Sequence, residues 1–588
     1  MFAMSQRYII QDYKRIMDKK LASNILLAIL ITSVFIFVWS FIYRFFIGAR
    51  ITSLITEFKP LVLLDGFNEQ EIFNITSPFW KSFGISFILT FVLAACMLLY
   101  RKVNYFGDAR WAYSGEVRNA NMLEEKGVIF GKYKGNYLRT DEALHFLLAA
   151  PTRSGKGVGF VIPNLLSWPD SVVVLDVKHE NYQLTAGFRK EHGQSVYKYS
   201  PFDADSRSHC FNPLEEIRTG EQRITDIQKL AVILIPTEKK GDMWANEARD
   251  LFVGLVLLVF DVDEFEKSIG QIYRILKTEM DFSGYIEEIL LDDTITLDNN
   301  CHMSLSSYKN KASKERSGVR STLVSALNLW SNPVLDAATS KSDFSFKSLR
   351  QKRTSIYFGC KVNQLNTLAP LINLFFQQCI DSLSETLPEN NEPYKVLLLI
   401  DEFAQLGKME SIVNGLAVLA GYNIRIALIV QGLGQMKALY MHDLDSLLQN
   451  TAIQIYFAGN DEITSKSVSS RLGKKTIRTR SRSSQGGYDT RGGSISTTSQ
   501  ARDLLLPEEF SRLPSTQQIV LKEHTRPVLA NKIRYYKNNE FKKRLLPEPE
   551  VPHLHIKDHS LVTSRNPEAR LNQDSRIESE ITALLEEE

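Results

Sequence analysis

A glycine-rich loop carrying one lysine lies between a short apolar run and a segment that can begin a helix. Residues 145–149 (HFLLA) read as a buried strand, residues 150–157 (APTRSGKG) as the loop, and residues 158–162 (VGFVI) as a first helical turn. The loop approaches the pattern G-x-x-x-x-G-K-[ST], in which backbone N–H groups and a lysine face phosphate oxygens. No other feature constrains the fold as much, because it predicts a nucleotide-binding α/β domain.

Two positions of the loop depart from that pattern. Ala150 replaces the first glycine, and Gly157 replaces the Ser or Thr whose hydroxyl normally reaches Mg²⁺. Water or another side chain would have to fill the place of that hydroxyl. The alternative is a simple glycine-rich turn between a strand and a helix. The predicted nucleotide-binding residues are Ala150, Pro151, Thr152, Arg153, Ser154, Gly155, Lys156, Gly157 and Val158.

A second motif, residues 395–402 (KVLLLIDE), ends an apolar run with two carboxylates. Five apolar residues in a row predict a buried parallel strand, and the carboxyl end of such a strand faces the ligand. We expect Asp401 to hold Mg²⁺ and Glu402 to orient and deprotonate the attacking water. Acids at a helix N-terminus would explain Glu402 but not its pairing with a phosphate loop.

A third apolar run, residues 424–430 (IRIALIV), ends at Gln431. Its amide is placed to reach a terminal phosphate or the attacking water and to report the nucleotide state, although a helix-capping or turn role is the alternative. The predicted catalytic residues are therefore Lys156, Glu402 and Gln431. Further strands are predicted at 171–176, 354–358 and 452–457, with helical patterns between them, such as 368–383 and 407–420. Alternating strands and helices predict a mostly parallel sheet with helices on both faces.

Composition adds limits to this prediction. The net charge of +3 over 588 residues makes the whole chain no strong polyanion binder, so any nucleic-acid contact must come from a local patch. Five cysteines are scattered without a CxxC pair, which argues against a disulfide framework or a zinc site.

Two long stretches near the N-terminus, Leu21–Tyr43 and Ser82–Tyr100, contain no charged residue. About 20 apolar residues cross a bilayer as a helix, so two transmembrane helices are expected. A cleaved signal peptide is the rival explanation for the first, but the stretch is too long and lacks a cleavage site. Basic residues before the first stretch and after the second predict that both termini lie in the cytoplasm, as expected for a multi-pass inner-membrane protein that contacts lipid.

These motifs, taken together, resemble the coupling ATPases of type IV secretion systems, membrane-tethered relatives of FtsK- and HerA-type translocases. The matching segments are residues 106–112 (FGDARWA), 151–159 (PTRSGKGVG), 176–180 (DVKHE), 244–249 (WANEAR), 401–407 (DEFAQLG), 506–510 (LPEEF) and 532–536 (KIRYY). The resemblance implies a RecA-like motor with an inserted all-α domain, ATP and Mg²⁺ as cofactors, and a ring of six subunits. It also implies delivery of protein or nucleoprotein substrates to a secretion channel, and it makes Gly157 a usual residue.

One position departs from the family. Some relatives carry an arginine that acts across a subunit boundary just before the glycine preceding the third strand, whereas here Ala420 precedes Gly421. Arg425 and Arg471 are the candidates for that role.

Three further segments complete the predicted organisation. Helical patterns predominate in the sequence between the strands predicted at 171–176 and 354–358. The tail after residue 545 contains ten acidic residues and four Lys or Arg. Residues 478–500 are rich in Ser, Gly and Arg, which predicts a mobile loop; Arg478, Arg480, Arg482 and Arg491 could contact DNA non-specifically, the alternative being a plain spacer. The predicted division is 1–20 cytoplasmic, 21–43 and 82–100 transmembrane, 44–81 periplasmic, 101–212 and 350–544 motor, 213–349 inserted all-α domain, and 545–588 acidic tail.

Three functions fit these features. The leading hypothesis is a homo-oligomeric ATPase that recruits protein or DNA–protein cargo for a type IV secretion channel. An FtsK-like DNA-only translocase is the second, although such a pump has no need of a large helical insertion. The third is a receptor scaffold that binds ATP but turns it over little. ATP hydrolysis measured with and without DNA separates the three.

Overall fold

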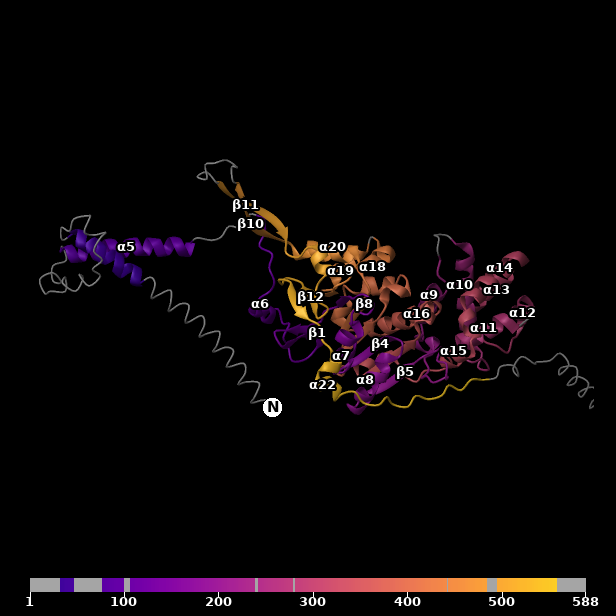
Figure 1. Cartoon of the computed structure of the whole chain (residues 1–588). Coiled ribbons are helices and arrows are strands. Elements are labelled where there is room, and N and C mark those ends of the chain that lie inside the picture. The colour runs from indigo at the N-terminus through magenta and orange to yellow at the C-terminus, as the bar shows by residue number, and fades with distance from the viewer. Residues whose placement is uncertain are drawn as a thin grey trace, which may run out of the picture. The chain divides into compact units, whose positions relative to one another are not determined.

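The chain divides into two compact units, residues 1–105 and 106–588. The computed structural model describes residues 32–46, 77–99, 106–237, 242–278, 281–441, 443–483 and 494–557 (Figure 1). Both predicted nucleotide motifs belong to the second unit.

The first unit holds a helix at residues 32–46 and α5 (Pro78–Leu99). The two helices contact each other, since Trp39 Nε1 donates to Ser82 Oγ at 3.1 Å. Within the described residues, no helix is both long enough and apolar enough to cross a membrane. The prediction of two transmembrane helices, at 21–43 and 82–100, is therefore wrong, and so is the multi-pass inner-membrane location derived from it.

The described helix at 32–46 spans about 22 Å at 1.5 Å per residue, against the roughly 30 Å of a hydrocarbon core. In α5, Lys81 lies in the first turn, and the buried positions include the hydroxyl residues Ser82, Ser86 and Thr90. Residues 21–31 of the first stretch, and 47–76 of the loop predicted between the two, lie outside the described residues.

An eleven-stranded sheet forms the centre of the second unit, in the order β2-β1-β13-β12-β9-β3-β8-β7-β4-β6-β5. The seven strands from β9 to β5 are parallel, whereas β12, β13, β1 and β2 extend the sheet with antiparallel pairs. The prediction of a mostly parallel α/β sheet is confirmed. The strands are β1 Val128–Tyr133, β2 Asn136–Thr140, β3 Phe146–Ala149, β4 Ser171–Val177, β5 Ser195–Tyr199, β6 Thr354–Cys360, β7 Val396–Ile400, β8 Ile424–Val430, β9 Ile453–Phe457, β12 Gln517–Lys522 and β13 Val528–Asn531.

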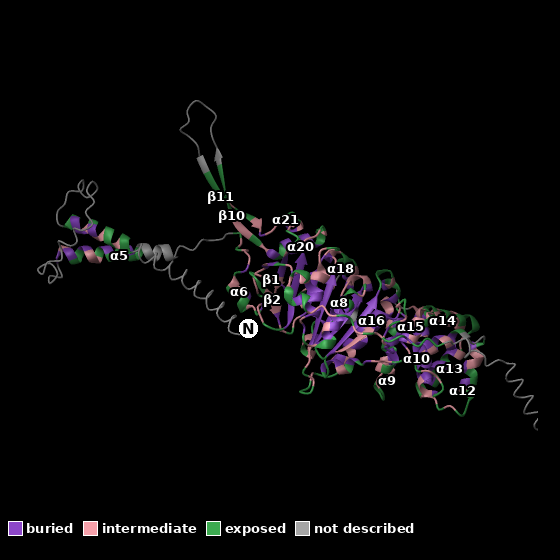
Figure 2. Ribbon diagram, turned by 60° about the horizontal axis from the view of Figure 1, so that its bottom comes forward, coloured by how far each residue is buried: buried purple, intermediate pink, exposed green. Residues whose placement is uncertain are grey.

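The sheet is buried on both faces (Figure 2). Side chains alternate along a strand, so Leu147 of β3 joins one hydrophobic core and Leu148 joins the other. The first core includes α16 (Leu365–Ser384), and the second includes α8 (Glu180–Glu191). Burial on both faces explains why these central strands read as continuous apolar runs.

A helical region follows β5 and precedes β6, and the described residues between these strands form no other strand. Its helices are α9 Gln222–Leu234, α10 Met243–Asp261, α11 Ile269–Thr278, α12 Phe282–Leu291, α13 Asn299–Lys309, α14 Ser313–Ala326 and α15 Pro333–Ala338. At the centre of the region, α10 has an almost unbroken buried run from Leu251 to Val259 and packs against α9, α11, α13 and α14. Treating residues 213–349 as a separate domain stays a prediction.

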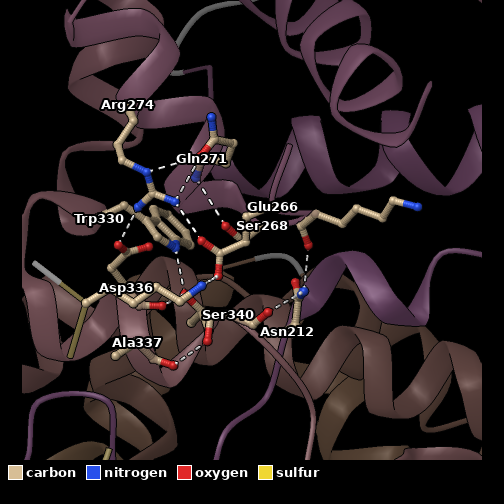
Figure 3. A network of polar contacts seen from close by, with 12 residues as sticks. Asn212, Glu266, Ser268, Gln271, Arg274, Trp330, Asp336, Ala337 and Ser340 are labelled. Atoms are coloured by element: carbon tan, nitrogen blue, oxygen red, sulfur yellow. Dashed lines mark hydrogen bonds and ion pairs between the residues drawn. The ribbon is translucent and has the colours of Figure 1, made fainter. Parts of the chain in front are cut away.

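A polar network fastens this helical region where the chain enters and leaves it (Figure 3). Asn212, on the entering connection, donates through Nδ2 to Lys267 O at 2.7 Å and to Ser340 O, on the returning connection, at 3.3 Å. Arg274 binds Asp336 at 2.5 Å and Glu266 at 2.9 Å. The two connections are thereby tied to the start of α11.

The segment predicted to be a mobile loop, residues 478–500, contains part of a β-ribbon. β10 (Lys474–Ser483) pairs antiparallel with β11 (Ser494–Asp503) along its whole length. The expectation of a loop is wrong for the described part, because the backbones of the two segments pair although neither segment carries an apolar face. Residues 484–493, Arg491 among them, lie outside the described residues.

The start of the predicted acidic tail lies against the motor rather than away from it. Tyr182 Oη donates to Pro549 O at 3.1 Å, Leu554 N donates to Ser206 O at 2.8 Å, and Lys557 pairs with Glu266 at 3.0 Å. Residues 545–557 thus run from the sheet to the helical region, as Figure 1 shows in yellow.

Candidate nucleotide site

The loop at 150–157 leaves the carboxyl end of β3, which lies between β8 and β9 in the sheet. Ala150 N donates to Val430 O at 2.8 Å and so holds the loop's beginning against the end of β8. Arg153 and Gly155 take positive φ values of 60° and 90°. A Cβ built on Gly155 would meet no atom within 4 Å, so the space over this part of the loop is open. The loop therefore has the compact turn and the room that a phosphate chain requires.

The helix after the loop begins as a π-helical turn, η1 (Gly157–Val161), and continues as α7 (Ile162–Leu165). Gly159 N donates to Gly155 O at 2.8 Å. A Cβ on Gly159 would lie 3.2 Å from Ile533 O, so glycine lets the segment after β13 approach this helix closely.

Lys156 meets both predicted carboxylates. Its Nζ lies 2.8 Å from Asp401 Oδ1 and also forms a short ion pair with Glu402 Oε1. β7, which ends just before Asp401, lies next to β8 and one strand removed from β3. The sheet order thus brings together two motifs that are 246 residues apart.

Glu402 is held from two further directions. Gln431 Nε2 donates to its Oε2 at 3.0 Å, and Gln405 Nε2 donates to the same oxygen at 3.2 Å. Glu402 itself has a φ of 54°, a left-handed conformation that turns the chain sharply from β7 into η6 (Phe403–Leu406). The predicted catalytic residues Lys156, Glu402 and Gln431 therefore lie in one contact network with Asp401.

Burial and charge act against each other in this network. Burial raises the pKa of Asp401, while the nearby Lys156 ammonium opposes the rise. For Lys156, burial acts to lower the pKa, but the charges and hydrogen bonds of Asp401 and Glu402 outweigh burial and leave the pKa raised. The ammonium is thus firmly charged, as contact with a polyanion requires.

Asp176, near the end of β4, is a second buried carboxyl group beside the site. It accepts hydrogen bonds from Tyr182 N at 2.8 Å and Asn181 N at 3.2 Å in the first turn of α8. Burial raises the pKa of Asp176 to about 7, and the negative charge of Asp401 adds to the rise. The following residues, Lys178 and His179, have positive φ values of 110° and 65°.

Lys532 is a site residue that sequence reasoning did not assign. It follows β13, its Nζ donates to Ser154 O in the phosphate loop at 3.2 Å, and it lies 3.8 Å from the centre of the Phe457 ring. Burial lowers the pKa of Lys532 to about 8, and Arg534 contributes to the lowering. Residues 532–536 had been noted as a motif, but only the fold shows that they meet the loop.

The candidates for an arginine acting across subunits lie away from these residues. Arg425 is the second residue of β8, at the opposite end of the strand from Gln431. It is buried and donates to Asp141 O at 2.7 Å and Glu142 O at 3.1 Å, so its own chain holds it. Arg471 is exposed, near the end of α20 (Glu462–Leu472), and donates to Tyr456 Oη at 3.1 Å.

The residues present fit a magnesium–nucleotide complex. Mg²⁺ prefers oxygen ligands and commonly takes one or two carboxylates together with phosphates and water. Asp401 offers such an oxygen beside the loop, and Gly157 offers none. In the part of the chain that the structure describes, no group of three His, Cys, Asp or Glu could hold a metal alone. A cation held jointly by Asp401 and phosphate oxygens agrees with this donor set.

Comparison with known proteins shows to which family the chain belongs. The family model for type IV secretory system conjugative DNA transfer matches residues 110–555. The chain belongs to this family. Protein VirD4 of Rhizobium radiobacter is 34% identical over 528 residues, which cover 85% of this chain and 75% of VirD4. The conjugal transfer protein TraG of Escherichia coli is 31% identical over 458 residues, covering 70% of this chain and 72% of TraG.

A solved structure also shares the fold found here. A solved structure of the plasmid coupling protein TrwB in complex with ADP and Mg²⁺ matches with a TM-score of 0.53 and 17% identity, over 74% of this chain and 96% of that one. At this identity the likeness shows the RecA-like α/β fold. The resemblance to type IV coupling proteins, first seen in the sequence motifs, is confirmed.

Proposed function

We propose that this member of the conjugative DNA transfer family is an ATP-hydrolysing coupling protein. The contact of Lys156 with both Asp401 and Glu402, on a phosphate loop with open space above it, carries the proposal. The TrwB complex with ADP and Mg²⁺ supports ATP and Mg²⁺ as the ligands of this chain.

Each residue of the network has a distinct task in this proposal. The loop's backbone N–H groups and the Lys156 ammonium bind phosphate oxygens. Asp401 holds Mg²⁺, which neutralises charge that develops on the phosphates. When Lys156 turns toward phosphate, Glu402 loses its counter-ion but keeps its hydrogen bonds from Gln405 and Gln431. Glu402 then orients a water molecule and accepts its proton.

The family supports a proposal for the substrate and the assembly. We propose that the chain forms a ring of six subunits and delivers DNA, with or without bound protein, to a type IV secretion channel. The helical region at 213–349 selects the cargo, because it adds surface without touching Lys156, Asp401 or Glu402. Arg471, being exposed, is the better placed of the two candidates to act on a neighbouring subunit.

The test is ATP hydrolysis by the purified full chain, with and without DNA. We expect Mg²⁺-dependent hydrolysis whose specific activity rises with protein concentration, since a neighbouring subunit would supply an arginine. If the chain hydrolyses no ATP under any condition, the ATP-binding scaffold is the remaining function. If DNA strongly stimulates hydrolysis and protein cargo has no effect, the DNA-only pump is the remaining function.

A second experiment tests cargo selection. Residues 213–349 are exchanged for the corresponding region of a relative that transfers different cargo, leaving the phosphate loop and the acidic pair untouched. We expect hydrolysis to persist and cargo preference to follow the exchanged region. Unchanged preference would refute the selecting role.

A further inference from the structure

The β10–β11 ribbon is strongly basic and carries little that could form a core. β10 (KKTIRTRSRS) has five basic residues and no acid, and β11 (SISTTSQARD) has one acid, at its last position. Ile477 and Ile495 are the only large apolar residues of the two strands. Two strands alone are marginally stable in water, so the composition of this ribbon points to a partner.

The base of the ribbon is fixed to the second unit. Ala109 N donates to Lys474 O at 3.0 Å, and Thr476 N donates to Gly107 O at 3.1 Å. Arg502 pairs with Glu509 at 2.5 Å. The β10–β11 ribbon projects from the body of the unit, as Figure 1 shows.

Two arginines lie on one face of the projecting part. Arg478 pairs with Ser499 and Arg480 with Thr497 in the antiparallel register, so all four residues share a face. Successive positions on one face are about 6.8 Å apart. Arg478 and Arg480 are exposed, and no acidic side chain of the described residues pairs with either. This face is therefore an unneutralised cationic surface on a fixed support.

We propose that the projecting part of the ribbon is an arm that binds the phosphate backbone of duplex DNA. Guanidinium groups bind phosphates bidentately, and the neighbouring Ser and Thr hydroxyls are further donors. Neither strand carries an aromatic residue on which the bases of a single strand could stack. A two-stranded ribbon also fits the major groove of duplex DNA. This proposal depends on the proposed function in one respect, namely that DNA is part of the transported substrate.

The experiment measures binding of the full chain to a fluorescent duplex of arbitrary sequence at several salt concentrations. The variant Arg478→Gln/Arg480→Gln is compared with the control Lys126→Gln/Lys190→Gln, which removes equal charge from exposed positions elsewhere. Each phosphate contact contributes about 0.9 to the slope of log K against log salt, so we expect the ribbon variant to lower the slope by about 1.8. At 0.1 M salt its affinity should fall about tenfold or more, while the control stays near wild type.

Several results would overturn the arm. They are an unchanged slope and affinity in the ribbon variant, an equal loss in the control, a loss seen with single strands but not duplex, and a loss of self-association without a loss of DNA binding. ATP hydrolysis without DNA separates this proposal from the proposed function. Hydrolysis by the ribbon variant at the wild-type rate is expected, because none of the described residues of the ribbon contacts Lys156 or Glu402. A wild-type chain that hydrolyses ATP but binds no duplex would refute the arm alone.

Discussion

Gln431 donates a 3.0 Å hydrogen bond to Glu402, a residue 29 positions earlier in the chain. The bond joins the carboxyl ends of the neighbouring strands β8 and β7. Glu402 also contacts Lys156, and Gln431 lies two residues before the start of α18 (Leu433–Tyr440). Gln431 therefore links the phosphate loop to a surface helix.

Replacing Gln431 by Ala tests that link. We expect kcat for ATP hydrolysis to fall about tenfold to a hundredfold with little change in KM, because the general base loses orientation while the phosphate contacts remain. Gln405→Ala is the matched comparison, since it removes the other amide bond to the same carboxylate oxygen. A large rise in KM with unchanged kcat would mean that Gln431 acts in binding instead.

Lys156→Ala removes the ammonium that faces the phosphates. We expect ATP binding, measured by titration calorimetry, to weaken by more than tenfold and hydrolysis to disappear. Lys190→Ala, a change at an exposed lysine of α8, should leave both unchanged. Wild-type turnover by the Lys156 variant would refute the assignment of the loop.

The core of this site could be predicted because its strands are buried on both faces. β3 and β7 are uninterrupted apolar runs, and β4, β8 and β9 are mostly apolar with one or two polar residues each. The antiparallel strands were not predicted; β2 (NYLRT), for example, has only Tyr137 and Leu138 as apolar residues and so shows no apolar run. The ribbon was mistaken for a loop because Ser, Gly and Arg give no strand pattern when pairing rests on the backbone. Lys532 could not be assigned, because its contact with Ser154 spans 378 residues.

Lys532→Met tests the clamp on the phosphate loop. The thioether keeps most of the contact with Phe457 but cannot donate to Ser154 O, so the loop loses one restraint on its backbone. We expect nucleotide affinity to fall about threefold to tenfold, as for the loss of one typical hydrogen bond of roughly 1 kcal/mol. Lys532→Arg should recover most of it. Equal affinity in Met and wild type would show that the contact does not support binding.

Asp176 predicts a dependence of stability on pH. Burial raises its pKa to about 7 in the folded chain, above its usual value of 3.8. The folded state then holds a proton that the unfolded state has lost. The stabilising contribution is full below about pH 4 and disappears as the pH rises through about 7.

The variant Asp176→Asn lacks that titration. We subtract the melting temperature of the wild type from that of the variant at each pH. We expect this difference to be about 1–3 °C larger at pH 8 than at pH 5.5, since other titrating groups change equally in both proteins. Thermal unfolding followed by circular dichroism at the two pH values measures the difference. A constant difference between the two proteins would mean that Asp176 does not titrate in this pH range.

The division of roles between Asp401 and Glu402 is tested most directly by Glu402→Gln. The glutamine keeps the size of the side chain and leaves Asp401 in place, but it cannot accept a proton from water. The measurement is ATP binding and ATP hydrolysis by the same preparation. The account predicts near-wild-type ATP affinity with hydrolysis slowed at least a hundredfold, as for the loss of a general base. Hydrolysis at the wild-type rate, or complete loss of ATP binding, would contradict it.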